Sequence, residues 1–107
     1  MTIQNYVNNV LLVPVSRIGN KQVVEAIELY LDERNHKFLP RLSEVTGKTI
    51  SALDNSLREA KRLSISNMDE KMKEKIFSTC ENSITITQFI IFAANYYKEN
   101  YENKEEG

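Results

Sequence analysis

The sequence predicts an all-α protein: a single compact domain of about six helices that contains a helix-turn-helix. Apolar residues recur at three-and-four spacing through almost the whole chain, which is the period of an amphipathic helix. The 107 residues suit one domain with one modest core, and the three glycines and two prolines do not form a linker that would divide it. Residues 39–62 contain two short helical patterns separated by Gly47, which is the outline of a helix-turn-helix.

The first two helices are expected in the N-terminal third. The apolar residues that indicate the first are Ile3, Tyr6, Val7, Val10 and Leu11. Pro14 is expected to end it, because the proline ring cannot continue the hydrogen-bond ladder. The second helix is expected to open at Gly19 or Asn20. Its apolar stripe is Val23, Val24, Ile27, Tyr30 and Leu31, and the acidic residues on its solvent face are Glu25, Glu28, Asp32 and Glu33.

The next two helices form the expected helix-turn-helix. A short helix runs from about Phe38 to Val45, and Gly47 supplies the turn, because glycine accepts a positive φ without steric penalty. The following helix begins near Thr49 or Ser51. The tetrapeptide "SALD" (51–54) has the form of a capping box in which Asp54 reaches back to the start of the helix. The expected buried stripe is Ile50, Leu53, Leu57 and Ala60, and the opposite face consists of Ala52, Asn55, Ser56, Glu59 and Arg62, with Ser51 and Arg58 at its edges.

The C-terminal part of the chain predicts two more helices. "SISN" (64–67) is expected to be a polar connector, and a helix over about 68–79 carries Met68, Met72, Ile76 and Phe77 on one side. "TCENSIT" (79–85) is expected to be a loop. "TITQ" (85–88) has the form of another capping box, and the last helix continues from it through Tyr96. We expect residues 1–99 to form the domain and residues 100–107 a frayed acidic tail.

The charge of the chain is unevenly distributed. The formal net charge of −1 argues weakly against a general nucleic-acid binder, which is usually basic. Residues 98–107 hold two lysines and four glutamates, whereas residues 34–62 hold seven lysines and arginines against three acids. The positive excess therefore falls on the expected helix-turn-helix, although most charge runs are simply solvated helix faces.

Several classes of function lack support in the sequence. There is no glycine-rich phosphate loop, zinc pattern or catalytic triad spelling, so we expect no enzyme, cofactor or metal site. His36 has no partner at metal-binding spacing and is expected to be a surface or capping residue. The single cysteine, Cys80, cannot form an internal disulfide, which fits the cytoplasm. No apolar run approaches a membrane span, and the N-terminus does not look like a secretory signal.

Four stretches together resemble a known family. They are "VP" (13–14), "IGNKQVVEAI" (18–27), "FLPRLSEVTGKTISALDNSLREA" (38–60) and "ITITQFIIFAANYY" (84–97). Their order and spacing resemble the C-terminal DNA-binding effector domain of the master sporulation response regulator of spore-forming bacteria. The resemblance implies an all-α domain whose helix-turn-helix reads a short DNA box in the major groove, and whose copies can line up in tandem on adjacent boxes.

The family domain normally follows a phosphoacceptor receiver domain. This sequence shows no aspartate-bearing α/β pattern, so we expect a stand-alone effector module without phosphorylation control on the same chain. Its small size and the lack of a sensor domain fit a regulator carried by a mobile genetic element such as a plasmid or phage.

This chain departs from the family at the residues that would face DNA. The resemblance places family arginines at Ala52 and Asn55, a histidine at Glu59 and a lysine at Glu44. The loss of arginines weakens both phosphate attraction and guanine readout. Either the target sequence differs from that of the family, or the DNA function has faded.

The position of each residue suggests a role toward double-stranded DNA. Ser51 and Asn55 lie near the start of the recognition helix, where side chains enter the groove, and Asn55 can bond adenine, so a box containing A·T pairs is expected. The basic residues would hold phosphates. The complete expected DNA-binding set is Lys48, Thr49, Ser51, Ala52, Asn55, Ser56, Arg58, Lys61 and Arg62. A site with only about four phosphate contacts predicts weak binding by a monomer. We therefore expect a homodimer or a tandem array on DNA.

An alternative stays open: a protein-interaction module that binds a polymerase subunit, a sigma factor or a related regulator without binding DNA itself. The missing arginines, the acidic net charge and the apolar-aromatic last helix favour it. In that segment Tyr96, Tyr97 and Tyr101 are expected to pack or to line a contact surface rather than to stack on bases.

Overall fold

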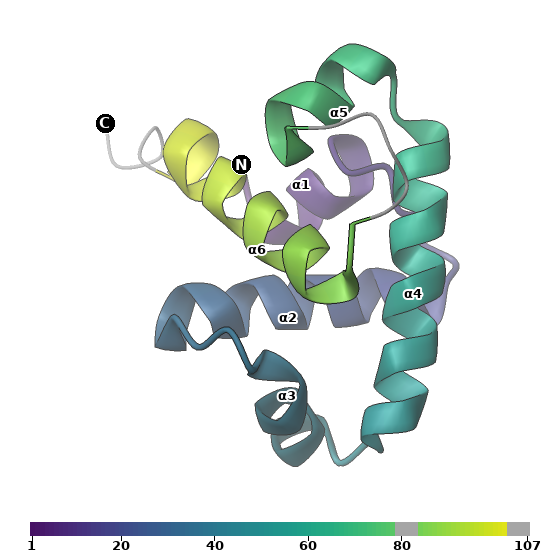
Figure 1. The fold of residues 1–107 in the computed structure, drawn as a ribbon, viewed down its shortest axis with the longest axis vertical. Helices are drawn as coiled ribbons and strands as arrows, with labels where there is room; N and C mark the ends of the chain where they lie inside the picture. Colours follow the sequence, from purple (N-terminus) through teal and green to yellow (C-terminus); the bar gives the residue numbers. More distant parts are fainter. Residues whose placement is uncertain (79–83, 103–107) are drawn as a thin grey trace.

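The computed structural model describes residues 1–78 and 84–102, and every regular element in that part of the chain is helical (Figure 1). The elements are α1 (Ile3–Asn9), α2 (Ile18–Glu33), α3 (Phe38–Thr46), α4 (Ile50–Asn67), α5 (Glu70–Phe77), α6 (Ile86–Tyr97) and the π-helical turn η1 (Lys98–Glu102). None of the described helices has the length and apolar character needed to cross a membrane. The predicted fold class is confirmed.

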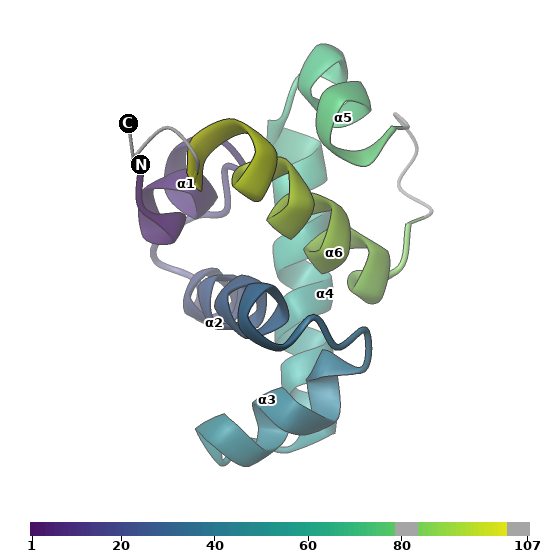
Figure 2. The same cartoon turned by 90° about the vertical axis from the view of Figure 1, so that its left-hand side faces the viewer.

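Helix α2 occupies the centre of the fold. It packs against α1, α3, α4 and α6, and Figure 1 shows it crossing almost at right angles to the long helix α4. Figure 2, in which α2 is seen nearly end on, shows α6 on one side of it and α3 on the other. As a result, α3 and the N-terminal half of α4 extend away from the rest of the molecule.

The core is built from the apolar stripes of these helices. Val23, Ile27 and Tyr30 of α2 are buried as predicted, and α6 contributes Phe89 and Ile90, which are completely buried. Among the described residues, the buried apolar side chains are Tyr6, Val7, Leu11, Val13, Val23, Ala26, Ile27, Tyr30, Phe38, Leu42, Leu53, Leu57, Ala60, Ile65, Met68, Ile76, Phe77, Ile84, Ile86, Phe89, Ile90, Ala93, Ala94 and Tyr97.

The connection from α1 to α2 differs from the expectation. Helix α1 ends at Asn9, and the backbone reverses at Leu12, whose φ of 57° is left-handed, so the chain has already left the helix before Pro14. The buried amide of Asn20 donates to the Val13 carbonyl at 2.9 Å and to the Asn8 side chain at 2.9 Å. These bonds hold the loop against α2, which begins at Ile18, one residue earlier than predicted.

The predicted connector "SISN" is wrong, because α4 continues through it to Asn67. Ser64 is fully buried, and its hydroxyl donates to the Leu11 carbonyl at 2.5 Å. The Asn67 amide donates to the Leu12 carbonyl at 3.0 Å. The loop after α1 therefore supplies acceptors for these polar side chains. Helix α5 accordingly starts later than predicted, with Asp69 as its N-cap.

The capping box predicted for the last helix is confirmed. The Thr85 hydroxyl accepts from the Gln88 amide nitrogen at 3.1 Å, and the Gln88 side chain accepts from the Thr85 amide nitrogen at 2.9 Å. Most of the predicted loop before it, residues 79–83 including Cys80, lies outside the described residues.

The end of the chain packs on its beginning. The Tyr6 hydroxyl donates to the Ala93 carbonyl at 2.7 Å, and the Tyr97 hydroxyl donates to the Met1 carbonyl at 2.7 Å. The Tyr101 ring lies 5.5 Å from the Tyr6 ring, measured between centroids. Tyr97 and Tyr101 therefore pack within the protein, as expected. The predicted tail over residues 100–107 begins within η1, and residues 103–107 lie outside the described part.

Candidate nucleic-acid interface

Helices α3 and α4 are joined by a short, internally bonded turn. Gly47 has a φ of 75°, the left-handed conformation that glycine adopts without strain, as predicted. The Ser43 hydroxyl donates to the Lys48 carbonyl at 2.6 Å, and the Lys48 amide donates to the Thr46 hydroxyl at 3.3 Å. These bonds restrict the orientation of α4 relative to α3, which a helix that reads a groove requires.

Thr49, not Ser51, caps helix α4. Thr49 has an extended backbone, and its hydroxyl accepts from the Ala52 amide nitrogen at 3.1 Å. Ser51 lies inside the first turn with its side chain exposed. The predicted capping box at "SALD" is therefore wrong, and Asp54 instead accepts from the Arg58 guanidinium at 2.8 Å.

Replacing Thr49 by alanine is expected to lower the free energy of unfolding by about 1 kcal/mol, because one amide at the start of α4 loses its acceptor. Ser51→Ala is the matched control and should change stability by less than about 0.5 kcal/mol. Urea denaturation of both variants checks this assignment, and a larger loss for Ser51→Ala would reverse it.

The buried stripe of α4 is largely the predicted one. Leu53, Leu57 and Ala60 are buried, but Ile50, the first residue of α4, is 47% exposed, so its predicted burial is wrong. The opposite face is exposed at Ser51, Ala52, Asn55, Arg58, Glu59 and Arg62. Ser56 is half-buried.

The half-buried position of Ser56 follows from a close contact between α2 and α4. A Cβ atom placed on Gly19 would lie 2.6 Å from the Ser56 carbonyl oxygen and 2.9 Å from the Ala60 Cβ. Glycine at position 19 thus lets the start of α2 touch the backbone of α4 directly. Ser56 stays a predicted DNA-binding residue, at the border between the exposed face of α4 and the contact of α4 with α2.

Asp54 and Glu59, the two acids of the predicted recognition helix, are both paired with arginines. Asp54 binds Arg58 within α4, and Glu59 binds Arg17, whose Nη1 lies 3.3 Å from the Glu59 carboxylate. Arg17 was absent from the predicted site. It precedes α2, and nothing in the periodicity of the sequence connects it with α4.

The predicted phosphate-binding cations differ in availability. The Lys61 ammonium is half-buried and donates to the Ile84 carbonyl at 2.7 Å, so it ties α4 to the segment before α6. Lys48 and Arg62 are exposed and form no ion pair within the described residues. Lys48, Arg58 and Arg62 are therefore the most accessible cations of the set.

The remaining basic residue of the pair α3–α4, Arg41, is engaged elsewhere. Its guanidinium donates to Glu33 at 3.0 Å and to Glu44 at 3.2 Å, and the hydrogen bond to Glu33 contributes most to raising its pKa above the ordinary value. Glu44 is already included in the charge count of residues 34–62, but Glu33 lies outside that range and offsets part of the positive excess.

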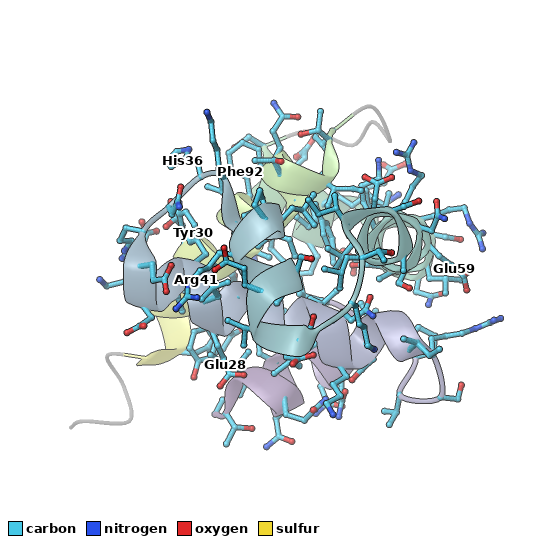
Figure 3. All side chains as sticks on the ribbon, turned by 90° about the horizontal axis from the view of Figure 1, so that it is seen from below. Glu28, Tyr30, His36, Arg41, Glu59 and Phe92 are labelled. Atoms are coloured by element: carbon cyan, nitrogen blue, oxygen red, sulfur yellow. The ribbon has the colours of Figure 1, made fainter. Side chains whose placement is uncertain are left out.

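The remaining candidate residues lie outside the α3–α4 pair. His36 is exposed and meets the Tyr30 ring edge-on at 5.8 Å. Within residues 1–78 and 84–102, no group of three His, Cys, Asp or Glu side chains is placed to hold a metal ion. Figure 3 shows Glu28 and Glu59 on different sides of the molecule, with Glu59 on the outer side of α4.

Comparisons with protein-family models, curated proteins and solved structures find no match to this chain. Its function is therefore inferred from the residues and their geometry.

Proposed function

We propose that the chain is a small sequence-specific DNA-binding transcriptional regulator that reads the major groove with α4. The observation that carries this proposal is the exposed polar face of α4. Helix α4 begins directly after the hydrogen-bonded turn at Gly47, and its N-terminal half extends away from the body of the fold (Figure 1). The resemblance to the effector domain of the sporulation response regulator, and a cytoplasmic location, agree with it.

Each residue of that face has a distinct role in the proposal. Asn55 is exposed, and its side chain makes no hydrogen bond within the described part of the chain, so both its donor and its acceptor are available to an adenine edge. Ser51 lies one turn earlier, and Ala52 between them allows close approach to a thymine methyl group. Lys48, Arg58 and Arg62 bind phosphates and set the register.

The small number of accessible cations makes the proposed complex sensitive to salt. With three phosphate contacts, a plot of log affinity against log salt concentration is expected to have a slope of about −3 per protomer. A homodimer or a tandem pair on adjacent boxes doubles that slope. Fluorescence anisotropy of a labelled duplex at several salt concentrations measures it, and an absence of binding at 50 mM salt contradicts the proposal.

A second candidate function, binding to a component of the transcription machinery, is favoured by a groove between α2 and α3. Its lining combines acids with apolar side chains: Glu25, Glu28, Leu29, Asp32, Leu42 and Val45. Val45 is 58% exposed. A basic, partly apolar segment of a polymerase subunit or sigma factor would complement this surface. Capture of purified RNA polymerase by the immobilised chain without DNA would favour this function over the first.

A further inference from the structure

We propose that Glu59 does not repel DNA but holds Arg17 beside α4, so that Arg17 contacts a phosphate next to the bases that α4 reads. This inference rests on the proposed DNA-binding function. It adds a phosphate-binding residue from outside the helix-turn-helix and assigns Glu59 a positioning role.

The ion pair between Arg17 and Glu59 joins the start of α2 to the exposed face of α4. Arg17 is the residue before α2, Glu59 lies in the middle of α4, and their side chains are 57% and 46% exposed. Glu59 follows Asn55 by one helical turn and therefore lies on the same face of α4. Arg17 is thus held close to the face that the proposal aligns with the groove.

The backbone under this pair is closely packed. The start of α2 rests on α4 at Gly19, where the Ser56 carbonyl and the Ala60 side chain leave no room for a Cβ atom. A hollow lined by Ser16, Arg17, Ile18, Gly19, Ser56, Glu59 and Ala60 lies at this junction. Because the two helices touch here, the Cα of Arg17 has a defined position relative to α4, and Glu59 then selects the direction of its side chain.

The chemistry of the two groups favours this arrangement over simple neutralisation. An exposed ion pair contributes little to folding, so the main consequence of the contact is where it places the guanidinium. Arginine has five N–H donors in a planar fork, and the contact with Glu59 leaves most of them available to phosphate oxygens. Pairing also removes most of the repulsion that a lone carboxylate would exert on the DNA backbone.

The direction in which one substitution changes DNA affinity distinguishes a positioning role of Glu59 from simple repulsion of phosphate. Glu59→Gln keeps the size of the side chain and removes its charge. If Glu59 positions Arg17, affinity for a bound duplex falls by about 3- to 10-fold; if Glu59 only repels phosphate, affinity rises. Arg17→Ala should weaken binding by about 10-fold and make the salt slope shallower by about 1. In the Arg17→Ala background, where Glu59 has lost this partner, Glu59→Gln should instead raise affinity, because it removes a lone carboxylate beside the DNA.

Glu99→Gln is the matched control, because it removes an exposed acid from η1, an element that does not carry the pair, and it should leave affinity within twofold. Circular dichroism establishes that all variants are folded. Tighter binding by the single variant Glu59→Gln, or unchanged affinity and salt slope for Arg17→Ala, overturns the inference while the proposed function stands. Failure of the unmodified protein to bind any duplex overturns both.

Discussion

Replacing Asn55 and Arg62 together by alanine is expected to weaken binding to the preferred duplex by about 50- to 1,000-fold. A bidentate asparagine–adenine contact discriminates by about 1–3 kcal/mol, and one lost phosphate contact costs roughly tenfold in affinity at 0.1 M salt. Both side chains are exposed on α4, and neither has an ion-pair partner or a hydrogen bond within the described part of the chain, so the fold itself should tolerate their removal.

A second double variant controls for the loss of an amide and a positive charge. Asn9 at the end of α1 and Lys71 in α5 are also exposed, and both lie outside the helix-turn-helix. Asn9→Ala with Lys71→Ala should bind within twofold of the unmodified protein. If the two double variants lose affinity equally in anisotropy titrations, α4 has no special part in binding.

Replacing Tyr6 by alanine is expected to lower the free energy of unfolding by about 3–5 kcal/mol, a loss large enough to leave much of the protein unfolded at 37 °C. Tyr6 is completely buried, and its ring contacts Tyr97 and Tyr101 at centroid distances of 5.1 and 5.5 Å. Urea denaturation measures the loss. A decrease below 1 kcal/mol would contradict the packing of η1 on α1.

Tyr6→Phe tests the buried hydroxyl separately. It leaves the Ala93 carbonyl without its donor and should cost about 1–2 kcal/mol at pH 7. Burial, followed by the neighbouring Tyr101 and Tyr96, raises the pKa of Tyr6 well above its ordinary value.

The raised pKa also predicts how stability depends on pH. The unfolded phenol ionises near pH 10 whereas the folded one stays protonated, so stability is fully present below about pH 10 and falls above it. The slope from Tyr6 approaches 1.4 kcal/mol per pH unit, and Tyr6→Phe should remove it. Tyr101, whose pKa burial also raises, leaves a smaller slope in the variant.

Local signals in the sequence predicted much of the fold. The capping box at Thr85 and the left-handed glycine at position 47 are confirmed because their bonds and dihedral angles depend on residues only a few positions away. The apolar stripes of α2 and α4 are mostly confirmed for a similar reason, since helical periodicity is a property of the segment itself.

Some wrong predictions are local, such as the capping box at "SALD", but others concern contacts between segments far apart in the chain. The sequence "SISN" suggested a solvated connector, yet Ser64 and Asn67 find acceptors in the loop after α1, and the helix continues. For the candidate site, the exposed face of α4 was predictable. The pairing of Glu59 with Arg17 and the diversion of Lys61 to the Ile84 carbonyl were not, because periodicity carries no information about partners on other elements.

The central claim is that the exposed face of α4 reads bases, and selection of bound duplexes from a random-sequence library tests it most directly. The unmodified protein is expected to enrich a short box that contains A·T pairs, and Asn55→Ala should lose the preference at one base pair of that box while keeping the rest. A library that remains random after repeated rounds, or an identical box recovered with Asn55→Ala, would contradict the claim.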